Sequence, residues 1–96
     1  MFDKMKQLME LKKQADQIKR DLEATQIEIQ EVKGIKILIN GSQNIQSLDI
    51  DESLLNPANK KNFERDLSRS LNAAVRKSQE AAASKMKALM PGFPGM

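Results

Sequence analysis

The sequence predicts a single α+β domain in which a long helix, a three-stranded antiparallel meander and a second long helix follow one another. Apolar residues recur every three or four positions over residues 1–24 and 59–90, and at alternate positions over residues 25–51. The first spacing is typical of amphipathic helices and the second of half-buried strands. A chain of 96 residues has room for one domain of this kind.

Residues 1–24 are predicted to form the first helix. Gaps of three and four residues alternate between their apolar positions, as in a heptad seam, and neither Gly nor Pro interrupts them. Lys, Gln, Glu and Met, which all favour helices, occupy most of the other positions. The seam consists of Leu8, Leu11, Ala15, Ile18 and Leu22.

Residues 25–51 are predicted to form three strands with one aliphatic face. Lys33-Gly34 separates the first apolar run from the second, and Asn40-Gly41 separates the second from the third. Asn-Gly is a strong turn signal because both residues tolerate positive φ. The aliphatic positions of the first two strands are Ile27, Ile29, Ile35, Ile37 and Ile39.

The third strand contains one irregularity. Leu48 and Ile50 share a face, whereas Ile45 is one residue out of step with them. We therefore expect either a β-bulge that begins at Ile45 or an Ile45 side chain that faces outward.

The second helix is predicted over residues 59–90. Asn59 is suited to capping its start, and Pro91-Gly92 ends it. Residues 91–96 then form a short tail that we expect to be flexible. The apolar side of this helix is lined by Phe63, Leu67, Leu71, Ala74, Val75, Ser78, Ala82, Met86 and Leu89.

The lengths of the two helices predict a homodimer. A helix of about 30 residues is about 45 Å long, whereas a compact domain of this size is only about 30 Å across. Helices that overhang their own domain must bury their apolar sides against each other or against another chain. The residues expected in the core or in the dimer contact are Leu11, Ile18, Leu22, Ile37, Ile39, Leu48, Ile50, Leu67 and Leu71.

The composition excludes the common catalytic and metal sites. The chain has no His and no Cys, so it lacks imidazole bases, thiol nucleophiles and the usual zinc ligands. It also has no Gly-rich phosphate loop. Asp49, Asp51 and Glu52 lack the spacing of a calcium loop and are better explained as turn and capping residues. We therefore expect no enzyme activity, no cofactor, no bound metal and no small-molecule substrate.

The chain also lacks the signs of export or membrane insertion. Its N-terminus carries charges every few residues instead of an apolar signal segment. No apolar run approaches the roughly 20 residues of a transmembrane helix. A cytoplasmic protein without a membrane partner is therefore expected.

Basic residues are concentrated in the second predicted helix. The chain has a formal charge of +3, but residues 59–96 contain 8 basic and 3 acidic side chains, whereas residues 26–58 contain 2 and 5. Five cations fall on one side of the helix, broadly opposite its apolar side, at about 100° per residue. We call them the basic stripe: Lys61, Arg65, Arg69, Arg76 and Lys87.

The basic stripe has the length and the residue types of a phosphate-binding surface. Arginine predominates, and its planar fork suits bidentate contacts with phosphate. A stripe about 40 Å long would span about one turn of duplex DNA. The simpler alternative is a solvated charged face, which every amphipathic helix has, although such faces normally mix both signs of charge.

The first helix gives a weaker signal of the same kind. Its basic residues include two adjacent pairs one heptad apart, but acidic residues lie among them. A solvated coiled-coil surface is therefore the more natural interpretation here. The candidates for auxiliary phosphate contacts are Lys12, Lys13, Lys19 and Arg20.

Several short segments, none of them catalytic, add to this pattern. They are Ile39-Asn40-Gly41, Leu48-Asp49-Ile50-Asp51 followed by Ser53-Leu54-Leu55, Leu71-Asn72-Ala73-Ala74 with Lys77, and Lys85-Met86 before Pro91-Gly92. With the order of helix, meander, long helix and Pro-Gly tail, they resemble the YbaB/EbfC family of bacterial nucleoid-associated proteins over nearly the whole chain. Members often have a Gly-rich stretch before the second strand, of which only Lys33-Gly34 is present here.

The resemblance implies a tweezer-like homodimer whose projecting helices bind double-stranded DNA, in the nucleoid or as a regulator of gene expression. The family has no fixed set of base-reading residues, so the basic stripe is a prediction from this sequence. We expect mostly phosphate contacts with little sequence specificity. The alternative is an interaction module without DNA binding, because helix, hairpin and helix also describe prefoldin-like chaperone subunits and coiled-coil adaptors. The odd number of strands and the basic second helix favour the DNA-binding protein.

Overall fold

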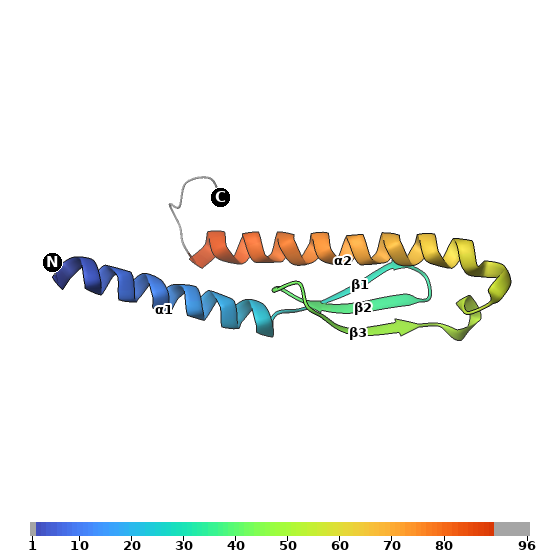
Figure 1. Ribbon diagram of the computed structural model, residues 1–96, viewed down its shortest axis with the longest axis horizontal. Coiled ribbons are helices and arrows are strands. Elements are labelled where there is room, and N and C mark those ends of the chain that lie inside the picture. Colours follow the sequence, from blue (N-terminus) through green and yellow to red (C-terminus); the bar gives the residue numbers. More distant parts are fainter. Residues whose placement is uncertain (1, 90–96) are drawn as a thin grey trace.

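The computed structural model describes residues 2–89 and has two layers, a three-stranded antiparallel sheet and a long helix along one face of it (Figure 1). The elements are α1 (Phe2–Ala24), β1 (Gln26–Val32), β2 (Ile35–Asn40), β3 (Ile45–Ile50) and α2 (Lys60–Leu89), with 3₁₀ turns at Glu52–Leu54 and Pro57–Asn59. The predicted α+β fold with the order α-β-β-β-α is confirmed. The predicted tail over residues 91–96 and the last predicted position of the second helix, residue 90, lie outside the described residues.

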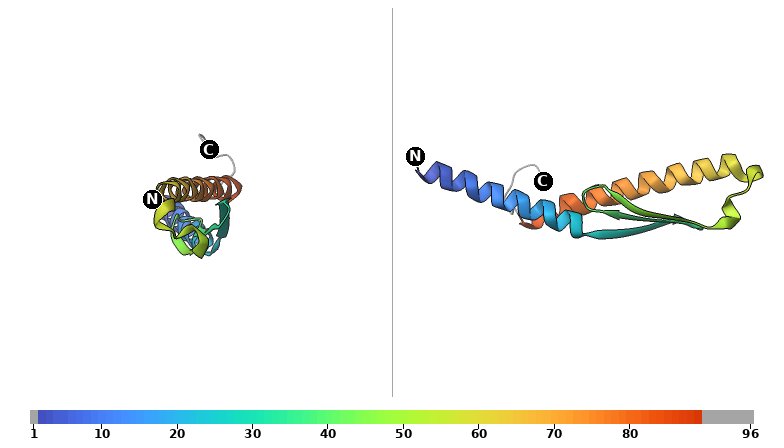
Figure 2. Two further views of the ribbon diagram at one scale, coloured as in Figure 1. Left: turned by 90° about the vertical axis from the view of Figure 1, so that its right-hand side faces the viewer. Right: turned by 60° about the horizontal axis from the view of Figure 1, so that its bottom comes forward.

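The protein is a thin rod. Its extents are 68 × 22 × 16 Å and its radius of gyration is 18.6 Å, against about 12 Å for a compact domain of this length. The right-hand view of Figure 2 shows α1 projecting from one end of the sheet. α2 runs back along the sheet, and its C-terminal part continues past the sheet beside α1. Both helices therefore extend beyond the sheet at the same end, and α1 extends farther.

The sheet has the order β1-β2-β3, so β1 and β3 are its two edges. Residues that pair directly in neighbouring strands lie on the same face of a sheet. Ile37 of β2 pairs with Ile29 of β1 and with Leu48 of β3. These three residues lie on the face toward α2, which we call the inner face.

The expected irregularity in the third strand is present. Ile45 lies opposite Ile39, but Ser47 lies opposite Leu38, so β3 contains one extra residue at this point. The shift is a β-bulge next to Ile45, which is the first of the two alternatives that the sequence left open.

The core lies between α2 and the first two strands. The three isoleucines of β2, at positions 35, 37 and 39, have no solvent exposure, and Ala73 and Ala74 of α2 pack against them. Among the residues predicted for the core or the dimer contact, the buried ones are Ile18, Ile37 and Ile39, and the partly buried ones are Leu22, Ile50, Leu67 and Leu71.

Leu11 and Leu48 are not part of this core. Their side chains are 51% and 46% exposed. Leu11 lies on the projecting helix α1, and Leu48 lies on β3, which α2 leaves uncovered because it packs mainly against β1 and β2. As core residues of the single chain, both predictions are wrong, and their place in a dimer contact stays a prediction.

The two glycine turns have different physical causes. Gly34, between β1 and β2, has a φ of +94°, a conformation that glycine adopts without steric cost. Gly41 is needed for space instead, because an added Cβ would lie 2.9 Å from the carbonyl oxygen of Leu22 at the end of α1. The positive φ in that turn falls on Gln43, at 66°. The turn was therefore predicted in the right place but for the wrong reason.

The cap before α2 lies one turn earlier than predicted. The Asn56 side chain accepts a hydrogen bond from the Ala58 N–H at 3.0 Å and begins the 3₁₀ turn that runs into α2, with Pro57 at its first position. Asn59 lies inside this turn, and its side chain donates to the Leu54 carbonyl oxygen at 3.2 Å. The cap predicted at Asn59 is therefore wrong, and Asn56-Pro57 is the start signal.

Candidate nucleic-acid interface

Small side chains hold α2 against the sheet. Ser70, Ala74 and Ser78, each four residues from the next, have no solvent exposure, and Ala73 is 3% exposed. Four residues complete about one helical turn, so these side chains form one line along α2. Because they are small, the helix backbone can approach the isoleucines of β2 closely. This line sets which side of α2 faces outward.

Asn40 joins α2, the turn after β2 and the end of α1. Its backbone carbonyl oxygen accepts a hydrogen bond from the Ser78 hydroxyl at 2.7 Å. Its side-chain oxygen accepts from the backbone N–H groups of Ser42 and Asn44, both at 3.0 Å, and its Nδ2 donates to the Glu23 carbonyl oxygen at 3.3 Å. The residue is 4% exposed. These buried contacts fix the two long helices relative to each other.

All five residues of the basic stripe are exposed on α2. Arg69 and Arg76 lie about 100° and 120° around the helix from the buried Ser70. Arg69 forms an ion pair with Glu31 of β1, with 3.4 Å between Nη2 and Oε1. The basic stripe therefore points outward from the sheet and leans toward the β1 edge.

Local partners hold two of the five stripe residues. The Glu31 carboxylate pairs with Arg69, whose side chain is 66% exposed. The Arg65 guanidinium donates to the side-chain oxygen of Asn62, one turn earlier on α2. Within residues 2–89, Lys61, Arg76 and Lys87 form no ion pair. The stripe therefore carries more positive charge than its nearest acidic side chains neutralise.

The cations proposed on α1 are also exposed. Lys12, Lys13, Lys19 and Arg20 form no ion pair within residues 2–89. The C-terminal part of α2, which carries Lys87, runs beside α1 (Figures 1 and 2). The structure therefore brings one end of the basic stripe next to α1, whereas Lys61 lies at the far end of α2.

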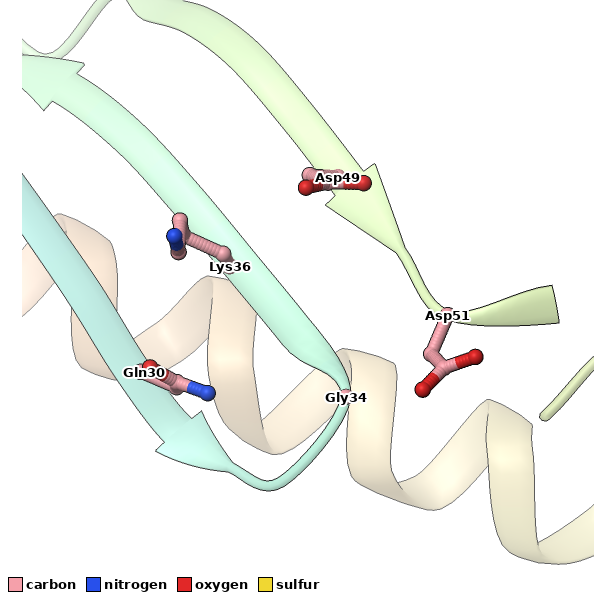
Figure 3. A pocket seen from close by; sticks show the side chains of 5 residues that line it. All are labelled: Gln30, Gly34, Lys36, Asp49 and Asp51. Atoms are coloured by element: carbon pink, nitrogen blue, oxygen red, sulfur yellow. The ribbon is translucent and has the colours of Figure 1, made fainter. Parts of the chain in front are cut away.

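The outer face of the sheet, opposite α2, has a different character. Figure 3 shows Gln30, Lys36 and Asp49 projecting from it around a shallow pocket that Gly34 and Asp51 complete. Lys36 lies 3.7 Å from the carboxylate of Glu28, and the side chain of Asp51 accepts a hydrogen bond from the Ser53 N–H at 3.1 Å. Asp51 therefore caps the 3₁₀ turn after β3, as the sequence suggested.

This outer face does not resemble a phosphate site or a metal site. Around the pocket, the two carboxylates of Glu28 and Asp49 outnumber the ammonium group of Lys36, so this part of the face does not attract phosphate. The described part of the chain contains no group of three or more acidic, His or Cys side chains arranged to hold a metal ion. Over the same residues, neither long helix has an apolar stretch that would cross a bilayer. The surface with the clearest excess of charge is the basic stripe.

Sequence reasoning missed two features of the interface. Ala74 and Ser78 were placed on the apolar side of the helix, but the buried Ser70 and Ala73 were not, because larger apolar residues dominate the helical pattern. The pairing of Arg69 with Glu31 joins residues 38 positions apart. It depends on how α2 lies over β1, which periodicity alone does not specify.

Comparison with known proteins agrees with the architecture. A sequence model described as the YbaB/EbfC DNA-binding family matches residues 1–93. The fold is similar to the crystal structure of the uncharacterized protein HP0035 from Helicobacter pylori, with a TM-score of 0.79 and 21% sequence identity. The match covers 94% of this chain and 97% of the Helicobacter chain. At this identity the likeness concerns the fold.

Proposed function

This chain belongs to the YbaB/EbfC DNA-binding family, and from that membership and the charge pattern of α2 we propose that it binds double-stranded DNA as a homodimer. The contacts are mainly to phosphates and come from the exposed cations of the long helices. The observation that carries the proposal is the basic stripe on the outward side of α2. The stripe makes the main contacts, and Lys12, Lys13, Lys19 and Arg20 of α1 add auxiliary ones.

The form of the stripe favours phosphate contact over base reading. The sheet holds α2 up to the part that continues beside α1, and along the helix the stripe is a line of charge about 40 Å long, close to one turn of duplex DNA. Arginine and lysine contacts to phosphates position a protein on DNA but carry no direct sequence information. The proposed binding is therefore mostly independent of sequence, which suits a role in organising the nucleoid and, through it, gene expression.

The shape of the single chain supports the homodimer. A rod 16 Å thin buries few residues, and large apolar side chains remain exposed on both α1 and β3. Exposed apolar surface of this kind marks sites of association. In the proposed dimer each chain presents one stripe and one projecting α1. DNA and a second copy are the proposed partners, in the cytoplasm at the nucleoid, without a membrane or a small-molecule substrate.

The first test is a salt series of binding to duplex DNA, with the molecular mass measured in parallel. Two chains carry about ten stripe cations, and if half of them engage, log K falls against log salt with a slope of about −4 to −5. Binding that is absent at about 50 mM salt, or that does not weaken toward 200 mM, contradicts phosphate binding.

A charge-reversal pair sharpens this test. The variant Arg65→Glu/Arg76→Glu should abolish binding while helical content and mass stay unchanged. Arg69 is left in place because its reversal would set a carboxylate against Glu31. The matched control uses single reversals: Lys33→Glu, in the turn between β1 and β2, changes the net charge as much as Arg76→Glu, and it should retain binding that Arg76→Glu weakens. Equal loss in both variants would show that net charge alone, and not the stripe, attracts DNA.

The alternative of an interaction or chaperone module has one observation in its favour. Met5, Leu8 and Met9 on the projecting α1 are 64–65% exposed. An aggregation-suppression assay beside the gel shift separates the two functions. Protection of a client protein that is lost in Leu8→Glu, with no binding to DNA, would favour the alternative.

A further inference from the structure

α2 ends beside the middle of α1. The Asn40 side chain donates to the Glu23 carbonyl oxygen of α1, and its own carbonyl oxygen accepts from Ser78 of α2, so Glu23 and Ser78 lie at about the same level of the rod. From that level both helices run past the sheet in the same direction (Figures 1 and 2). α2 extends eleven residues beyond Ser78 and ends at Leu89. The position eleven residues before Glu23 is Lys12, so Leu89 lies at about the level of Lys12.

A shallow hollow lies on α1 at about this level. Its lining residues are Gln7, Glu10, Leu11 and Gln14, and we call it the α1 hollow. All four lie within about 80° of Ile18 around the helix. Ile18 is 8% exposed and marks the side of α1 that meets the rest of the chain. The α1 hollow therefore opens on the side of α1 on which α2 ends.

The α1 hollow offers apolar surface to a neighbour. The Leu11 side chain is 51% exposed, and the alkyl stems of glutamine and glutamate add apolar area around it. Toward the N-terminus of α1, beyond the level at which α2 ends, no element of residues 2–89 runs alongside the helix (Figure 1). A segment that continued from α2 would meet this surface first.

The segment that continues from α2 is apolar. Residues 90–96 read Met-Pro-Gly-Phe-Pro-Gly-Met and contain no charged side chain. Phe93 is the large side chain among them. Pro91 and Pro94 restrict the backbone, so less conformational entropy is lost when the segment becomes ordered on a surface.

Phe93 can reach the α1 hollow. It follows Leu89 by four residues, and an extended proline-rich chain advances about 3.1 Å per residue, so about 12 Å of chain is available. Packed helices lie about 8–10 Å apart, and Leu11 is about 1.5 Å from the level of Leu89 along the rod. The distance to cross is therefore shorter than the chain that crosses it.

We propose that residues 90–96 dock on the α1 hollow of the same chain, with the Phe93 ring against Leu11. The occupant is this segment because it starts at the level of the hollow, is long enough to enter it and carries matching apolar side chains. Its terminal position led us to expect a flexible tail, but the exposed apolar surface beside its start favours a docked one. The inference goes beyond the proposed function, since it requires neither DNA nor a second chain.

Docking braces the projecting helix and leaves its cations exposed. Lys12 and Lys19 lie about 120° and 100° around α1 from Ile18, and Lys13 and Arg20 lie farther round. The docked segment covers the side of Ile18 and so avoids all four. The segment therefore holds the direction of α1 relative to α2 while the auxiliary phosphate contacts stay free.

A disulfide experiment in the full chain tests the contact, because the wild-type sequence has no Cys. Gln7→Cys/Met96→Cys places one thiol in the α1 hollow and one in the segment, and Phe93 is kept. The matched control is Met9→Cys/Met96→Cys, since Met9 is exposed on the same stretch of α1 but lies about 180° from Ile18. With oxidised glutathione, the first pair should close within one chain at least about tenfold faster than the control.

Two outcomes of this experiment overturn the inference. Equal rates for the two pairs would mean that the segment does not prefer the α1 hollow. A product of double mass on a non-reducing gel would mean that it docks on α1 of a second copy instead of its own.

Amide hydrogen exchange tests the role of Phe93 without a cross-link. Phe93→Ser should speed exchange over residues 7–14 of α1 about three- to tenfold, because the apolar contact that braces this stretch is lost. Phe93→Leu keeps an apolar side chain and should stay close to wild type, and β2 should not change in either variant. Unchanged exchange over residues 7–14 in Phe93→Ser overturns the docking.

The outcomes also separate this inference from the proposed function. If the Gln7→Cys/Met96→Cys pair closes rapidly in a protein that binds no duplex DNA, the proposed function is wrong and the docking stands. If the protein binds DNA and the two cysteine pairs close at equal rates, the docking is wrong and the proposed function stands.

Discussion

The two long helices of this protein have the same spacing of apolar residues and different surroundings. Each has apolar residues every three or four positions and cations between them. α2 buries Ser70, Ala74 and Ser78 completely against the sheet, whereas on α1 the buried hydrophobic residue is Ile18, and Leu8 near its projecting end is 65% exposed. One helix is built into the core, and the other extends from it.

The comparison shows what helical periodicity determines and what it leaves open. Periodicity places the apolar side of a helix, but the element that covers this side depends on tertiary contacts. Here Asn40 and its hydrogen bonds hold α2 along the sheet and direct α1 away from it. The two helices also differ in their charges. α2 carries a basic stripe with few acidic neighbours, whereas α1 has basic and acidic residues mixed together.

The largest expected effect of this difference is on stability. Ile37→Ala removes a side chain with no exposure from the contact between β2 and α2, and the cavity should cost about 2–5 kcal/mol of unfolding free energy. Leu8→Ala on α1, where the side chain is 65% exposed, should change it by less than about 0.5 kcal/mol. Urea denaturation followed by circular dichroism measures both. Equal losses would show that α1 is packed as firmly as α2.

A smaller effect is expected at the hydrogen bond that sets the position of α2. Ser78→Ala removes the hydroxyl that donates to the Asn40 carbonyl oxygen and accepts from the Gln43 N–H. Because these two backbone groups also bond to each other at 3.2 Å, the cost should be about 0.5–1.5 kcal/mol. Ser84→Ala, on an exposed part of the same helix, is the control and should be close to neutral. If both serines prove equally dispensable, the Ser78 contact does not hold α2 in place.

The fold was largely predictable because its local signals agree with one another. The strand pattern of Ile35, Ile37 and Ile39, the helical spacing and the Asn40-Gly41 turn all correspond to elements in the structure. Leu48 and Leu11 are not in the core of the single chain, because α2 packs mainly on β1 and β2 and because α1 projects beyond the sheet. Neither property is encoded locally.

The candidate site was predictable to the same extent as the fold: the local pattern was predicted, but the tertiary contacts were not. The positions of the five stripe cations on one exposed side follow from helical geometry, and all five are exposed. The acid that pairs with Arg69 was not foreseen, because Glu31 approaches only through the packing of α2 on β1. The role of the stripe cations in DNA binding stays a prediction. We expect α1 and α2 to contribute unequally to that binding.

Neutralising the two helices separately compares their contributions to DNA binding. Arg65→Gln/Arg76→Gln on α2 should reduce the magnitude of the salt slope by about 0.9 for each phosphate that the variant no longer neutralises. Lys12→Gln/Lys13→Gln on α1 removes the same charge and should have a smaller effect, because acidic residues accompany those lysines. Fluorescence anisotropy with a labelled duplex at several salt concentrations gives both slopes. A larger change from the α1 variant would make α1 the main DNA-binding helix.

The smallest expected effect concerns the acid that already holds a stripe residue. DNA must compete with Glu31 for Arg69, so Glu31→Gln should strengthen duplex binding at low salt. An exposed ion pair contributes about 0–1 kcal/mol, so the gain is at most about fivefold and should vanish as salt rises. Glu28→Gln is the matched control, because it removes the same charge from the same strand but pairs with Lys36 on the outer face. A gain for Glu31→Gln over Glu28→Gln would place the DNA at Arg69, whereas equal gains would mean that DNA responds only to net charge.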